Sequence, residues 1–335
     1  MRKVQTMSDE LDMDSSGLVC AYAFDGRGGG RPLDWPEIDV PSAPGEARWV
    51  HVDFTNARAC EWVRERAGVD RIIADALLAD DSRPRAVEHD DGLLVTLRGV
   101  NKNPGADPED LISIRFWLTT DRILSTRRRR LLSVRSIRDD IEAGRGPAGP
   151  AAFLLQLVDK LGDRINPVID ELDEQLEVAE LSVETDARLT YTSEFASVRR
   201  QAMRIRRFLA PQRDGFERLS RQHSALLSDD DRFQLREEAD RLTRFLEDLD
   251  LVRERAMVAQ EELLARYAQE QNSRMYLLSI VAALFLPLSF LTGLMGMNVA
   301  GLPGMEDTRA FAIVCLVMAG CAIGIIGVFK WKKWF

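Results

Sequence analysis

Three consecutive residues, Gly296, Met297 and Asn298, are the part of the sequence best placed to interact with an ion, because they close a long uncharged segment. The amide of Asn298 can hydrogen-bond the water molecules of a hydrated cation without displacing them. The alternative is purely structural, since Gly and Asn both tolerate the left-handed conformation that ends many helices. The triplet alone does not decide between these interpretations, so the residues that lead to it have to be considered.

An acidic column precedes the triplet at a seven-residue spacing and consists of Asp240, Glu247, Glu254 and Glu261. Seven residues are close to two helical turns, so these carboxylates share one face of a helix. In the same and the adjoining register the face then becomes small, polar or weakly apolar, and we call this part the pore column: Asn272, Met275, Ser279, Ala282, Leu286, Ser289 and Gly293. An apolar stripe covers the opposite face of the stalk: Leu242, Phe245, Leu249, Val252, Ala256, Ala259 and Leu263.

Two interpretations of these columns remain open. They are either the solvated side of an amphipathic helix followed by a packing face for membrane helices, or the lining of a lumen between copies of that helix. The pore column has no charged residue, His or Cys, so a lumen of this kind would pass a cation with its water shell, which Mg²⁺ in particular gives up reluctantly. Met275 and Leu286 would then be hydrophobic constrictions that gate by dewetting.

Two uncharged runs, Met275–Met305 and Ala310–Phe329, each reach the roughly 20 apolar residues that a helix needs to cross a bilayer. The polar N-terminus lacks the apolar core of a signal peptide, and we expect none. Basic residues flank the two runs on their outer sides: Arg266, Arg274, Lys330, Lys332 and Lys333. The positive-inside rule therefore predicts a protein of the cell (inner) membrane with both termini in the cytoplasm and a short loop outside.

The expected fold class is an α+β membrane protein. Alternating or apolar segments predict strands at 18–26, 48–54, 92–100 and 112–118, with a helix near 57–68. Beyond the Gly- and Pro-rich segment 144–150 the pattern is helical, and Ser228 with three following aspartates resembles a helix start. We expect an α/β domain over residues 1–145, a helical region over 146–228, a stalk helix over 229–297 that includes a first span at about 276–297, an extracytoplasmic loop over 298–308, a second span over 309–329 and a basic tail over 330–335.

Composition excludes several classes of function. The net charge of −9 argues against a nucleic-acid-binding protein, whose surface would be basic. No P-loop, nucleophile elbow or HExxH pattern occurs, so we expect neither an enzyme nor a resident cofactor. The three histidines, His51, His89 and His223, are scattered without metal-ligand spacing and are interpreted as ordinary strand or surface residues. Two spans cannot enclose a path across a membrane, so conduction would require a homo-oligomer.

The two-span arrangement with its Gly-x-Asn triplet resembles the CorA-type divalent-cation transporters. Three parts of the sequence are similar to the ZntB-like branch, which is associated with zinc. They are residues 276–304, "RRFLAPQRD" at 206–214 and the basic C-terminal tail. The resemblance implies a homopentameric funnel in the lipid bilayer, with an α/β cytoplasmic domain, stalk helices around an axial pore and a selectivity filter at Gly296, Met297 and Asn298. The transported ion would be Zn²⁺ or another divalent cation.

Two features of the sequence indicate different branches of this family. Met297 is typical of magnesium-transporting CorA, whereas the loop "VAGLPG" is of the ZntB-like kind. A CorA-like Mg²⁺/Co²⁺ channel is therefore the alternative within the class, and a membrane-anchored sensor or scaffold is the alternative outside it. Proton coupling, which the ZntB-like resemblance includes, would need titrating groups at the ends of the path. These are the outer-loop acids Glu306 and Asp307, or the acidic column on the inner side.

Overall fold

The computed structural model describes residues 16–43, 45–80, 83–185, 190–222, 224–297 and 309–332. The chain divides into two compact units, an N-terminal unit of Met1–Gln260 and a C-terminal unit of Glu261–Phe335. The strands are β1 (Leu18–Phe24), β2 (Gly30–Pro32), β3 (Arg48–Asp53), β4 (Arg85–His89), β5 (Gly92–Gly99), β6 (Ile112–Leu118) and β7 (Arg122–Arg127). The helices are α2 (Trp35–Ile38), α3 (Ala57–Glu65), α4 (Arg71–Leu77), α5 (Leu132–Glu142), α6 (Pro150–Thr185), α7 (Thr190–Arg221), α8 (Asp229–Met295) and α9 (Ala310–Trp331).

The N-terminal unit is built on one sheet with the strand order β2-β1-β3-β7-β6-β5-β4. Neighbouring strands are antiparallel except β3 and β7, which run parallel with Arg48 opposite Arg122. The chain therefore builds the sheet from an N-terminal part and a later part, and joins them through one central parallel pair.

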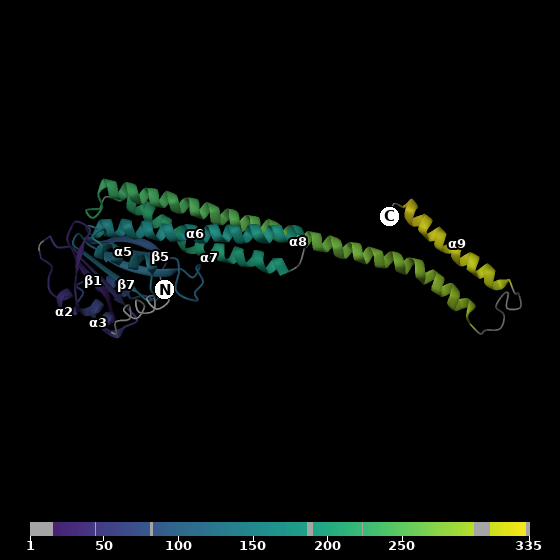
Figure 1. Ribbon diagram of the computed structural model, residues 1–335, viewed down its shortest axis with the longest axis horizontal. Coiled ribbons are helices and arrows are strands. Elements are labelled where there is room, and N and C mark those ends of the chain that lie inside the picture. The colour runs from purple at the N-terminus through teal and green to yellow at the C-terminus, as the bar shows by residue number, and fades with distance from the viewer. Residues whose placement is uncertain are drawn as a thin grey trace. The chain divides into compact units, whose positions relative to one another are not determined.

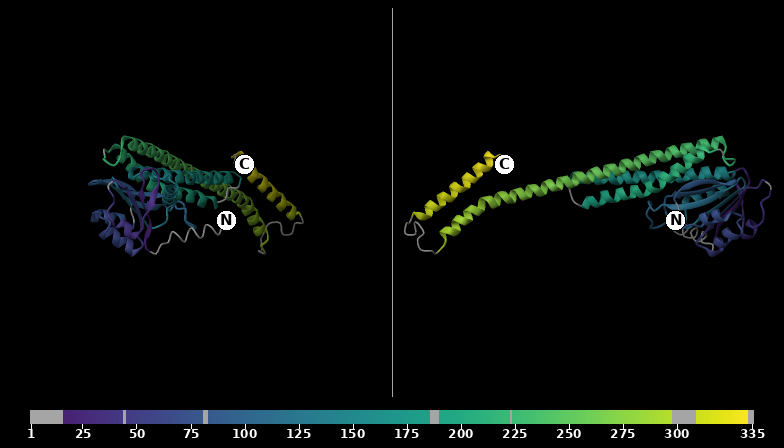
Figure 2. Two further views of the ribbon diagram at one scale, coloured as in Figure 1. Left: turned by 60° about the vertical axis from the view of Figure 1, so that its left-hand side comes forward. Right: turned by 180° about the vertical axis from the view of Figure 1, so that it is seen from behind.

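Helices cover both faces of this sheet, as Figures 1 and 2 show. Side chains alternate between the faces along a strand. Val50 and Val52 of β3 therefore point to a core that they share with Trp62 and Ile73 of α3 and α4. The intervening Trp49 points the other way, with its ring 4.8 Å from that of Phe153 on α6. The fold thus buries both surfaces of its strands, which explains why they are rich in apolar residues.

The four predicted strands and the helix near 57–68 are confirmed. So are the helical segments that correspond to α6, α7 and the start of α8. At that start, the Ser228 N–H donates to Asp231 Oδ2 at 2.8 Å and the Asp231 N–H donates to Ser228 Oγ at 3.2 Å, which closes a capping box.

Two features differ from the expected organisation. Strands β2, β4 and β7 were not predicted, because they are short or bounded by arginines that hide their alternation. The regions 1–145 and 146–228, expected as separate parts, belong to the same compact unit, because α6 and α7 pack against β5 and α7 also contacts β4. The segment 144–150 therefore separates types of secondary structure within one unit.

Candidate ion pathway

Helix α8 is fixed in the N-terminal unit by its apolar stripe. Leu242, Leu249 and Val252 are buried, and of the whole predicted stripe only Ala259 is half-exposed. Ion pairs reinforce the same packing, since Arg241 contacts Asp163 at 2.7 Å and Arg255 contacts Glu180 at 2.7 Å, both on α6. The hydrogen bond with Glu180 is the main reason why the pKa of Arg255 is raised. The rotation of α8 about its axis is therefore determined within this unit.

The acidic column lies on the side of α8 that does not pack against the N-terminal unit and is therefore exposed. Asp240, Glu247, Glu254 and Glu261 are all exposed, and none of them makes an ion pair within the described residues. Successive members are about 10 Å apart along the helix. Arg241 and Arg255, which follow two members of the column directly in the chain, are engaged with acids of α6 instead. The column is thus a row of exposed carboxylates on one helix face without ion pairs among the described residues.

The pore column in the C-terminal unit is exposed along its whole length in the single chain: Asn272, Met275, Ser279, Ala282, Leu286, Ser289 and Gly293. The Ser279 hydroxyl donates to the Met275 carbonyl of its own helix at 2.9 Å. Because that donation uses its proton, the Ser279 oxygen presents only acceptor lone pairs outward. This is the polarity that the water shell of a cation requires, since that shell directs its hydrogen atoms outward.

The predicted filter lies at the end of α8 and only part of it is described. The helix ends at Met295, and the Gly296 N–H donates to the Thr292 carbonyl at 3.0 Å. Gly296 is not among the described glycines with positive φ, so the left-handed helix closure considered above is wrong for this residue. Met297 is exposed. Asn298 and the outer-loop acids Glu306 and Asp307 lie outside the described residues.

Both predicted spans are helices that are long and apolar enough to cross a membrane, by length and composition. The first is the C-terminal part of α8 and the second is α9. Neither span has its apolar window buried within the single chain. In α9, Leu316 and Ile323 are among the most exposed large apolar residues. Their apolar surface therefore has to be covered by lipid or by other chains.

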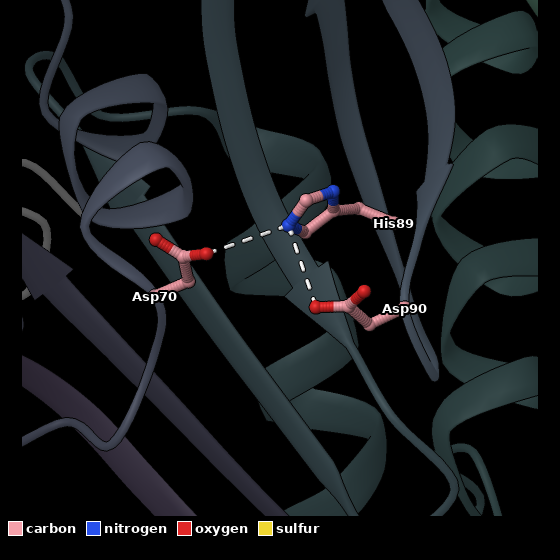
Figure 3. Close-up of side chains that lie close together, drawn as sticks. All are labelled: Asp70, His89 and Asp90. Atoms are coloured by element: carbon pink, nitrogen blue, oxygen red, sulfur yellow. Dashed lines mark ion pairs between the residues drawn. The ribbon is translucent and has the colours of Figure 1, made fainter.

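The histidines behave in two ways. His51 is fully buried in β3, where its Nδ1 is 2.8 Å from Ser125 Oγ, and burial holds its pKa well below 6.5; it is a strand histidine, as predicted. His89, at the end of β4, lies beside Asp70 and Asp90 (Figure 3). Spacing along the chain could not reveal this cluster, because the fold alone brings Asp70 to the other two residues. His223 lies outside the described residues.

Comparisons with known proteins agree with this architecture. Residues 44–331 match the family described as CorA-like Mg²⁺ transporter protein. The chain is 39% identical over 324 residues to the divalent cation transporter CmaX of Pseudomonas aeruginosa, covering 96% of this chain and 98% of that protein. It is 33% identical over 322 residues to the zinc transport protein ZntB of Yersinia pseudotuberculosis, covering 95% and 96% of the two chains.

Solved structures show the same fold. The full-length CmaX structure superimposes with a TM-score of 0.84, covering 96% of this chain and 99% of that one at 39% identity. The CorA magnesium transporter of Methanocaldococcus jannaschii gives a TM-score of 0.80 at 16% identity, covering 95% of this chain and 99% of that one. The chain belongs to the CorA-like Mg²⁺ transporter family, whose members are ion transporters and not enzymes. The predicted family and fold class are confirmed, and divalent metal ion transport is the activity of the class.

Proposed function

We propose that this protein transports hydrated divalent cations, with Zn²⁺ preferred, through an axial pore formed by α8 helices of a homopentamer in the cell (inner) membrane. One observation carries the proposal. A single helix presents an acidic column and then a column of small and polar residues interrupted by Met275 and Leu286, and both lie on exposed surface of the single chain. An axial path needs negative charges that attract cations, and it needs a lining that accommodates a cation together with its water shell.

The selectivity filter is assigned to Gly296, Met297 and Asn298. Five Asn298 amides around an axis would accept hydrogen bonds from the water of a dication and leave its inner shell intact. The pore column offers no thiolate, imidazole or carboxylate, which are the ligands that bind Zn²⁺ directly. We therefore assign no inner-sphere metal site in the path, and expect weak discrimination between dications. Met275 and Leu286 provide the hydrophobic constrictions.

Relatives support zinc as the preferred ion. The matching relatives are named zinc transport protein ZntB and divalent cation transporter CmaX, at 33% and 39% identity over nearly the whole chain. The second candidate is Mg²⁺ or Co²⁺, which is favoured by Met297 and by the description of the family as a whole. Both candidates use the same pore and differ only in the ion.

The basic flanks support an orientation with both termini in the cytoplasm and the outer-loop acids Glu306 and Asp307 at the outer mouth. The groups able to take up or release a proton while an ion passes are those two acids, or Glu247, Glu254 and Glu261 at the inner end. No residue between Met275 and Met305 titrates near neutral pH. If transport is coupled to protons, neutralising these terminal acids changes its pH dependence.

The test is uptake of Zn²⁺ and of Mg²⁺ into proteoliposomes, with and without an inward proton gradient. Asn298→Ala is the filter variant. Asn166→Ala is its matched control, since Asn166 is an exposed residue of α6 in the N-terminal unit. Zn²⁺ uptake that the gradient accelerates, that Asn298→Ala abolishes and that Asn166→Ala retains supports the proposal. Mg²⁺ uptake without an effect of the gradient favours the second candidate. Intact oligomers without any flux would leave a membrane-anchored sensor or scaffold.

A further inference from the structure

Three side chains from two separate segments of the N-terminal unit converge on one point (Figure 3). Asp70 precedes α4, His89 is the last residue of β4, and Asp90 lies in the turn between β4 and β5. The His89 Nε2 atom is 3.5 Å from Asp70 Oδ2 and 3.5 Å from Asp90 Oδ2. All three ligand atoms lie within 4.8 Å of one another. None of these residues belongs to α8 or α9, which form the proposed pathway.

The distances in this cluster suit a metal better than hydrogen bonds. At 3.5 Å, each nitrogen-to-oxygen separation is longer than the range of about 2.7–3.2 Å that N–H···O bonds occupy. The Nε2 atom is shielded from solvent, yet it makes no hydrogen bond within the described structure. Two ligands bound at about 2.0–2.2 Å to one tetrahedral Zn²⁺ are about 3.4 Å apart. Both separations in the cluster have this length.

The surrounding structure holds the three ligands in place. Asp70 caps α4, with its Oδ1 accepting a hydrogen bond from the Ile72 N–H at 2.9 Å, so its other oxygen is directed at His89. The His89 ring contacts Trp117 edge to face at 6.4 Å between centroids. Gly92 makes room for that tryptophan, since a Cβ at this position would lie 2.0 Å from its ring.

We propose that Asp70, His89 and Asp90 bind one Zn²⁺ per protomer, separately from the transport pathway. Imidazole nitrogen and carboxylate oxygen are both zinc ligands, and three protein ligands leave a fourth position for water. The imidazole favours Zn²⁺ over Mg²⁺, because Mg²⁺ takes oxygen ligands in octahedral geometry and gains nothing from a nitrogen donor. The side chains of Asp70 and Asp90 are exposed, whereas the His89 Nε2 atom is shielded, so an ion would reach the carboxylates first and then the imidazole. The bound ion would join the start of α4 to the β4–β5 hairpin.

The first measurement is the number of zinc ions retained by the full-length protein in lipid nanodiscs, after equilibrium dialysis against a fixed free Zn²⁺ concentration. Asp70→Asn and His89→Gln each remove one ligand, and Asn is as good a helix cap as Asp, so α4 keeps its start. Glu88→Gln is the matched control. It removes an exposed carboxylate next to His89 in the chain, but the side chain of Glu88 points to the other face of the sheet. Both ligand variants should retain one zinc ion fewer per protomer than the wild type, and the control should retain the same number.

The second measurement needs no variant. Diethyl pyrocarbonate modifies accessible imidazoles, and mass spectrometry locates the modified residue. Zn²⁺ should protect His89 and Mg²⁺ should not, while the buried His51 is unmodified throughout. Unchanged zinc stoichiometry in His89→Gln, or modification of His89 that zinc does not slow, would show that the cluster is only an ion pair and would overturn the proposal. Binding is measured without a gradient, so failure of zinc transport in proteoliposomes leaves this test intact.

Discussion

Helix α8 meets two different environments within the single chain. In the N-terminal unit one face is packed away, and Leu249 is 0% exposed. Beyond Leu263 the same helix has no buried residue as far as Met295, and Leu286 is 76% exposed. The N-terminal unit therefore completes its own core, whereas the C-terminal unit leaves its apolar surface to lipid and to copies of the chain. Stability should depend on the first part of the helix and transport on the second.

The largest expected effect tests the first half of this comparison. Leu249→Ala should lower the free energy of unfolding of the N-terminal unit by about 2–5 kcal/mol, because it opens a cavity in a packed core. Leu278→Ala makes the same change in the C-terminal unit at a residue that is 68% exposed, and should cost less than about 1 kcal/mol. Urea unfolding followed by tryptophan fluorescence, to which the buried Trp49 contributes, measures the stability of the N-terminal unit in both variants. Equal effects would mean that the two parts of α8 are packed alike.

A second substitution tests the other half. A side chain added at Gly293 would meet no atom within 4 Å in the single chain, and the same is true of Gly320 on α9. Gly293→Leu should therefore leave each chain folded but reduce Zn²⁺ flux roughly tenfold or more, because it would fill the proposed pore in every subunit. Gly320→Leu is the control, and its flux should be retained. A flux that is unaffected by Gly293→Leu would place the pore column away from the ion path.

Acid should destabilise the N-terminal unit through His51, a group with no counterpart in the spans. Burial holds the pKa of His51 well below 6.5, so the unfolded chain takes up a proton that the folded chain refuses. Stability is therefore lost as the pH falls through 6.5, by about 1 kcal/mol between pH 6.5 and 5.5. His51→Gln should remove this part of the slope of thermal stability against pH. A slope unchanged by the substitution would assign the effect to other groups.

The smallest effect concerns the acidic column. Changing Glu247, Glu254 and Glu261 together to Gln should leave stability almost unchanged, because these exposed residues make no ion pair within the described residues. Flux at low ionic strength should fall by about twofold to threefold, and the difference should shrink in high salt, which screens the charges. Glu262→Gln, on another face of the same helix, is the control. A loss of flux that salt does not alter would point to direct binding instead of attraction.

The fold could be predicted wherever the pattern is local. The seven-residue period placed Leu249 on the buried side of α8 and Glu247 on the exposed side, because a helix repeats on the scale of a few residues. Strand β7 was missed because arginines at both ends mask the alternation of "RILSTR". Its parallel pairing with β3 was also beyond prediction, since no local pattern encodes which distant strands become neighbours.

The same distinction applies to the functional residues. Periodicity assigned the pore column, and the exposure of its residues is compatible with that assignment without testing it. The cluster at His89 could not be found in this way. His89 and Asp90 are adjacent in the chain, but Asp70 reaches them only because α4 is packed beside the end of β4. When the fold brings ligands together from distant segments, their spacing in the sequence follows no helical or strand period.

The parallel pair at the centre of the sheet has a consequence for how the chain folds. Strands β3 and β7 are 74 residues apart along the chain, whereas β5, β6 and β7 follow one another closely. Closing a long loop costs entropy before its contacts repay it, so pairings of this kind form late and slowly. During synthesis, the edge of β3 that pairs with β7 stays unpaired until β7 has left the ribosome. The slow step in making this transporter should therefore be the closure of its sheet, before either membrane span has been synthesised.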